Sequence, residues 1–87
     1  MPQRTATIAA ADGLHARPAT LFVEVARASG LDVTIGREGE AAVSGTSILS
    51  LMGLGAKRGE TVVISAEGQG AETVLDDLAA LLESTGE

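Results

Sequence analysis

The spacing of apolar residues switches repeatedly between the two-residue period of a strand and the helical period, and this alternation limits the fold more than any other feature. Strand-like alternation covers residues 5–9, 31–35, 41–43 and 61–66, and helical spacing covers 15–29, 47–52 and 71–83. Each segment has one apolar side, so each must pack on that side alone. The order β-α-β-β-α-β-α therefore predicts a two-layer α+β domain, with a layer of strands and a layer of helices.

The apolar sides of these segments predict the core. In the first helix the buried stripe should consist of Pro18, Leu21, Phe22, Val25 and Ala26. In the strands it should consist of Val33, Ile35, Val62, Ile64 and Ala66, and in the last helix of Val74, Leu75, Leu78, Leu81 and Leu82. Gly30 is a typical residue after a helix, and either Thr46 or Ser47 should cap the short middle helix.

Composition limits the classes of function. The chain has 87 residues, and we expect one small domain over its whole length. It contains no cysteine, which excludes disulfides and thiolate metal sites and suits a reducing cytoplasm. No uncharged stretch is long enough to span a bilayer, so we expect no membrane insertion.

The charge balance argues against nucleic acid as a partner. Six basic and twelve acidic residues give a formal net charge of −6, and Phe22 is the single aromatic residue that could stack on a base. An acidic surface usually aids solubility. The alternative is that it meets a partner with a basic docking surface.

The residues best suited to carry a reaction lie in the run Gly13-Leu14-His15-Ala16-Arg17-Pro18-Ala19-Thr20, which contains the only histidine. A neutral imidazole is a good nucleophile near pH 7, since its ordinary pKa is about 6.5. The first turn of a helix offers free N–H groups, here those of Ala16 and Arg17, and the positive end of the dipole. The run therefore predicts that His15 accepts a phosphoryl group. The alternative is an ordinary surface or capping histidine.

Other polar residues carry weaker predictions. Asp12 could orient the imidazole, although Asp-Gly is more often simply a loop, and Arg27, Arg37 and Arg58 are interpreted as ordinary solvated residues. One histidine and no cysteine cannot assemble a nitrogen- or sulfur-rich metal site. No residues have the spacing of a hydrolytic triad. We expect neither a metal nor a cofactor.

These motifs resemble the HPr family, the histidine-containing phosphocarriers of the bacterial phosphoenolpyruvate-dependent sugar phosphotransferase system. The resemblance runs nearly end to end. It rests on Gly13-Leu14-His15-Ala16-Arg17-Pro18-Ala19, on Ser47-Ile48 before Met52-Gly53-Leu54-Gly55, and on Ile64-Ser65-Ala66 with the closing helix. It implies an open-faced two-layer β-sandwich, in which a four-stranded antiparallel sheet is covered on one face by three helices.

The resemblance also implies the chemistry. Enzyme I would phosphorylate His15 at Nδ1, with phosphoenolpyruvate as the source, and Arg17 would steady the phosphoryl group. The group would then pass to IIA domains of sugar permeases. The chain would thus be a cytoplasmic phosphoryl carrier and a monomer, and not an enzyme.

Ser47 supports the alternative function of a regulatory binding module. In many Gram-positive relatives a serine in this position is phosphorylated by HPr kinase/phosphorylase, which slows transfer to the histidine and enables catabolite repression through a transcription factor. Thr46 is a rival for that modification, although the spacing to Gly53-Leu54-Gly55 favours Ser47.

The short middle helix has more apolar residues than one face can bury, namely Ile48, Leu49, Leu51 and Met52. Exposed apolar residues beside a reactive loop indicate a docking surface. We therefore expect partners to dock on the surface around Ala16, Thr20, Ile48, Leu49 and Met52.

Overall fold

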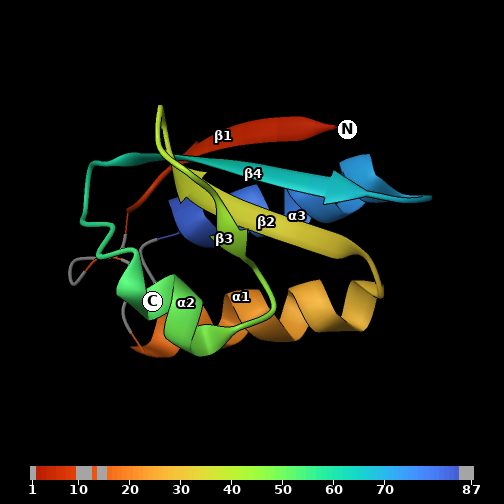
Figure 1. Cartoon of the computed structure of the whole chain (residues 1–87), viewed down its shortest axis with the longest axis horizontal. Coiled ribbons are helices and arrows are strands. Elements are labelled where there is room, and N and C mark those ends of the chain that lie inside the picture. Colours follow the sequence, from red (N-terminus) through yellow and green to blue (C-terminus); the bar gives the residue numbers. More distant parts are fainter. Residues whose placement is uncertain (1, 10–12, 14–15, 85–87) are drawn as a thin grey trace.

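The computed structural model describes residues 2–9, 13 and 16–84, and its elements follow in the expected order. They are β1 (Gln3–Thr7), α1 (Ala16–Ser29), β2 (Asp32–Arg37), β3 (Val43–Ser44), α2 (Ile48–Gly53), β4 (Thr61–Glu67) and α3 (Ala71–Glu83). The four strands form one antiparallel sheet in the order β1-β4-β2-β3, and the helices cover one of its faces (Figure 1). The predicted open-faced α+β sandwich is confirmed.

The central strand β4 determines how the two halves of the sheet meet. It pairs antiparallel with β1 on one side and with β2 on the other. Ile64 lies opposite Ile35 in this register, and Ala66 lies opposite Val33. Since side chains alternate between the faces of a strand, these four apolar side chains share the face that the helices cover, and all are buried.

The first strand begins earlier than the pattern predicted. The sequence favoured residues 5–9, but β1 runs over Gln3–Thr7. The ladder with β4 ends at Thr7, and the two residues that follow bond elsewhere: the N–H of Ile8 donates to Glu60 O at 2.9 Å and the N–H of Ala9 to Leu82 O at 3.0 Å. Ile8 is buried although it lies beyond the sheet, so its burial pattern mimics a strand residue.

The buried stripe of α1 is rotated relative to the prediction. Leu21, expected in the core, is 45% exposed, whereas Ala19, Phe22, Val23 and Ala26 are buried. These four follow i, i+3, i+4, i+7 spacing and therefore share one helix face. Two of them are alanines, which let α1 approach α2 and α3 closely but which contribute little to an apolar pattern in the sequence.

The remaining helices agree with their patterns. Leu75, Leu78 and Leu82 of α3 are buried, and α1 ends at Ser29, directly before Gly30, which has a positive φ of 72°. None of the described helices has the length and hydropathy that a bilayer span requires.

Candidate functional site

The predicted phosphoryl site lies at the start of α1. Asp12, Leu14 and His15 are outside the described residues. The helix begins at Ala16, directly after His15, and Arg17 is exposed in its first turn. That turn contains no acidic residue that would compete with an anion. A cation at a helix N-terminus opposes the helix dipole by about 0.3–1 kcal/mol, so helix stability does not explain Arg17.

Gly13 packs against the loop between α2 and β4. Its φ is 72°, and a Cβ at this position would lie 2.5 Å from the carbonyl oxygen of Ala56 and 2.9 Å from the Cα of Lys57. Only glycine fits such a contact with backbone, and only glycine adopts this φ without strain. The glycine of the predicted motif is therefore required by packing as well as by local conformation.

Arg37 is a structural residue, which corrects its interpretation as simply solvated. Its Nη2 donates to Gly55 O and to Glu60 Oε1, both at 2.8 Å. No local pattern indicates these contacts, because Arg37 ends β2 and its partners lie 18 and 23 residues away. Arg27, also interpreted as solvated, is exposed and donates from Nε to Thr46 O at 3.2 Å.

Ser47 is the N-cap of α2. Its backbone is extended and its side chain accepts a hydrogen bond from the N–H of Ser50 at 3.3 Å. Of the two capping candidates, Ser47 is thus confirmed. Thr46 instead lies 3.0 Å from the hydroxyl of Ser44, oxygen to oxygen.

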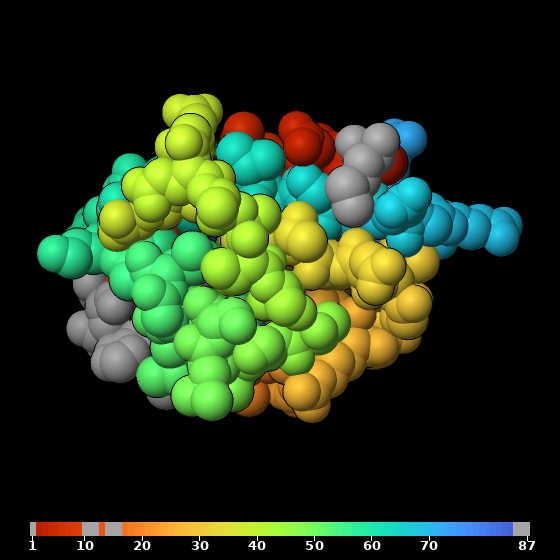
Figure 2. Space-filling view, in the orientation of Figure 1, coloured from red at the N-terminus to blue at the C-terminus, as the bar shows by residue number. Residues whose placement is uncertain are grey.

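Apolar side chains are exposed on α2, as the composition of the short helix predicted. Leu49 is 80% exposed and Met52 is 37% exposed, whereas Leu51 is buried. Ile48 is half-buried and packs against the core. In Figure 2 the green atoms of α2 form part of the molecular surface beside the orange atoms of α1.

Leu21 extends this surface onto α1. It follows Arg17 by four residues and Thr20 by one, so the three share an exposed helix face. The same spacing could have placed Leu21 on this face from the sequence. We call Thr20, Leu21, Leu49 and Met52 the α1–α2 patch.

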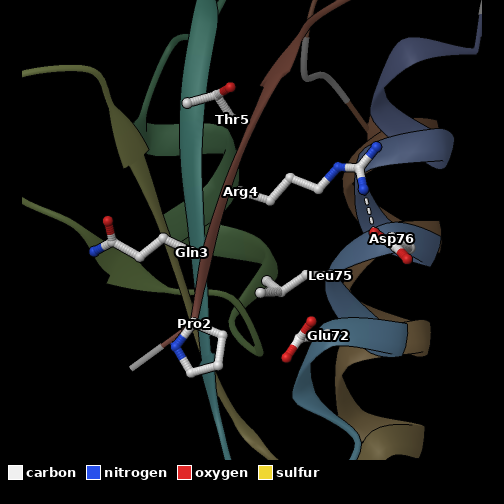
Figure 3. Close-up of a pocket in the computed structure, with 7 residues that line it drawn as sticks. All are labelled: Pro2, Gln3, Arg4, Thr5, Glu72, Leu75 and Asp76. Carbon is white, nitrogen blue, oxygen red and sulfur yellow. Dashed lines mark hydrogen bonds and ion pairs between the residues drawn. The ribbon is translucent and has the colours of Figure 1, made fainter.

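An open hollow of about 710 Å³ lies elsewhere, between β1 and α3. Arg4 reaches across it to the carboxylate of Asp76, and Glu72 lies on the same helix (Figure 3). None of the residues predicted for the site lines this hollow. Across the described part of the chain, no cluster of His, Cys, Asp and Glu side chains could hold a metal ion.

Known proteins resemble the chain in both sequence and structure. A family profile described as "PTS HPr component phosphorylation site" matches residues 2–84. Phosphocarrier protein HPr of Streptomyces coelicolor is 43% identical over 82 residues, covering 94% of this chain and 88% of that protein. Phosphocarrier protein HPr of Haloferax volcanii is 45% identical over 83 residues, covering 94% of this chain and 93% of that protein. The crystal structure of HPr-C-His from Thermoanaerobacter tengcongensis matches with a TM-score of 0.89 and 36% sequence identity, and the match covers 99% of this chain and 96% of that one.

The fold and these similarities first define a class, the phosphocarrier proteins of the phosphotransferase system. Within that class, the chain belongs to the HPr family.

Proposed function

We propose that this chain accepts a phosphoryl group on Nδ1 of His15 from phospho-enzyme I and passes it to IIA domains of sugar permeases. The group originates from phosphoenolpyruvate. The match of the phosphorylation-site profile to residues 2–84 is the observation that carries the proposal. The chain acts in the cytoplasm as a single-domain, monomeric carrier with no turnover of its own.

The start of α1 supports this role. A phosphohistidine carries about two negative charges near neutral pH. The guanidinium of Arg17 and the first-turn N–H groups of Ala16 and Arg17 are suited to meet that charge, and no carboxylate in the first turn opposes it. Arg17 is exposed, so each contact is modest, which suits a carrier that must release its cargo.

Each transfer forms one bond to phosphorus and breaks another. The lone pair of Nδ1 attacks the phosphorus atom of phospho-enzyme I, and a P–N bond forms as the bond to the donor breaks. The donor leaves with the electron pair of the broken bond. In the second transfer, Nδ1 of His15 is the leaving group and the acceptor on IIA forms the new bond.

Intact mass after incubation with phosphoenolpyruvate and enzyme I tests the proposal. We expect a single phosphoryl increment that disappears in mild acid, because the P–N bond of a phosphohistidine is acid-labile whereas a serine phosphate ester is stable. An unchanged mass, with folded protein and active enzyme I, would contradict the proposal.

We propose further that partners dock on the α1–α2 patch. Replacing Met52 with Asp should raise the concentration for half-saturation of phospho-enzyme I about tenfold, since a charge in an apolar contact costs more than about 1 kcal/mol. Met52 is 37% exposed while Leu51 supplies the buried side chain of α2, so the stability of the fold should change by less than about 0.5 kcal/mol.

The matched control for Met52→Asp is Ala80→Asp, which adds the same charge to an exposed position of α3. It should leave the half-saturation concentration unchanged. Equal effects of the two substitutions would point to net charge and against a docking role for the patch.

Ser47 supports the regulatory alternative, modification by a kinase that uses ATP. A phosphate on the N-cap of α2 is compatible with the helix, because anions are favoured at that end. ATP and an HPr kinase should add an acid-stable increment to the wild type that Ser47→Ala abolishes and Thr46→Ala retains. The reverse result would assign the modification to Thr46.

A further inference from the structure

We infer that Arg37 and Glu60 are positioning residues for the phosphoryl-accepting histidine, and that they act through the loop between α2 and β4. The inference rests on the proposed function of His15. Neither side chain belongs to the His15–Arg17 motif or to the α1–α2 patch. Their contacts instead hold the backbone against which Gly13 packs.

The two side chains form hydrogen bonds to consecutive peptide units of the loop. Arg37 Nη2 donates to the carbonyl oxygen of Gly55 at 2.8 Å, which fixes the Gly55–Ala56 unit. Glu60 Oε1 accepts from the N–H of Lys57 at 2.6 Å, which fixes the Ala56–Lys57 unit. The same Oε1 accepts from Arg37 Nη2 at 2.8 Å, so the two contacts are coupled. We call this arrangement the Arg37–Glu60 clamp.

The second of these peptide units is the one that Gly13 touches. Its C=O, from Ala56, and the Cα of Lys57 are the atoms that a Cβ at Gly13 would meet. Its N–H is the group that Glu60 holds. Because a peptide unit is planar and rigid, fixing the N–H also fixes the carbonyl on its other side. Glu60 therefore sets the surface on which Gly13 rests.

The end of the same loop also holds the chain that leads out of β1. The N–H of Ile8 donates to Glu60 O at 2.9 Å, and the N–H of Gly59 donates to Ile8 O at 2.8 Å. The loop thus contacts the chain at Ile8 and at Gly13, on either side of residues 10–12. A shift of the loop would move both contact points.

Gly13 is close to His15 along the chain. Two residues span at most about 7 Å even when fully extended. In phosphoryl transfer the nucleophile must be aligned with the bond that breaks, and a displacement of about 1 Å can slow such a step about 100-fold. The loss of the clamp should therefore slow the transfer step. It should not weaken docking, because α2 is anchored separately by Leu51 and by the Ser47 cap.

Arg4 supplies a matched control. It forms an ion pair with Asp76 that joins β1 to α3 and includes no residue of the loop. The side chains of that pair are 46% and 64% exposed, against 29% and 36% for Arg37 and Glu60. Removing Arg4 thus removes an arginine ion pair without touching the surface on which Gly13 rests.

The test is single-turnover transfer from preformed phospho-enzyme I, followed by rapid quench at increasing concentrations of carrier. For Arg37→Met and Glu60→Ala we expect the maximal rate to fall about tenfold and the half-saturation concentration to stay within about twofold of the wild type. Arg4→Met should change neither quantity. The maximal rate of Glu60→Gln should lie between those of Glu60→Ala and the wild type, since the amide oxygen of the glutamine can still accept a hydrogen bond from the N–H of Lys57.

All variants are assayed below their measured unfolding temperatures, so that a loss of stability does not lower the rate. If Arg37→Met is unfolded in the assay, Glu60→Gln and Arg37→Lys replace it. Wild-type rates in the folded clamp variants, or a change confined to half-saturation, would overturn the positioning role and leave the proposed function intact. No transfer to the wild type would overturn the proposed function itself, and the positioning role with it.

Discussion

Replacing His15 with Ala should abolish the uptake of a phosphoryl group from phospho-enzyme I. His15 is the only imidazole in the chain, so no second nitrogen nucleophile of this kind can replace it. The fold should survive, because the hydrophobic core is formed by other residues, from Ala6 to Leu82. Intact mass should show no acid-labile increment, and circular dichroism should match that of the wild type.

Arg17→Met is the matched variant for His15→Ala. It keeps the nucleophile and removes one cation beside it, so the full increment should still form, about tenfold more slowly. That factor corresponds to the ~1–2 kcal/mol of one charge-assisted hydrogen bond at a solvent-exposed site. An acid-labile increment on His15→Ala would place the phosphoryl group on another residue and refute the assignment.

Replacing Phe22 with Ala should have the largest effect on stability. Phe22 is completely buried and is the only aromatic residue, and the Cβ of a residue at Gly45 would come within 3.1 Å of its ring. Phenylalanine-to-alanine changes in cores cost about 3–5 kcal/mol. For a domain of this size the midpoint of thermal unfolding should fall by on the order of 20 °C.

Leu21→Ala is the control for Phe22→Ala, one residue away on the same helix. Leu21 is 45% exposed, so its truncation should cost less than about 1 kcal/mol. Urea unfolding of both variants measures the two free energies. Comparable losses would mean that Leu21 is as buried as the periodicity of the sequence predicted.

Most of the fold was accessible from the sequence because the relevant signals are local. The switch between strand and helical periods identified every element in its order, and Ser47 was one of two candidates for the N-cap it proves to be. The predicted ends of the elements were less accurate. Ile8 is buried like a strand residue although β1 ends at Thr7, and the sequence pattern alone could not separate the two situations.

The sequence likewise predicted some features of the candidate site correctly and others wrongly. The run from Gly13 to Thr20 predicted a nucleophile, a cation and a helix start from residue types and spacing alone, and α1 begins where that run requires. The pattern also predicted exposed apolar residues on the short middle helix, and Leu49 and Met52 are exposed. It correctly placed Phe22 and Ala26 in the core but also placed Leu21 there, because the spacing of large apolar residues gave no weight to Ala19 on the face that is actually buried.

Interactions between neighbours in the chain explain what residue types and spacing could predict: the type and order of the elements, two candidates for the cap of α2, and a histidine two residues before an arginine at the expected start of a helix. The packing of the sheet against the helices decided that Arg37 contacts Gly55 and Glu60. It also decided that Gly13 rests on the Ala56–Lys57 peptide unit. These contacts join residues far apart in sequence, and their geometry follows from how sheet and helices pack, which no local pattern encodes.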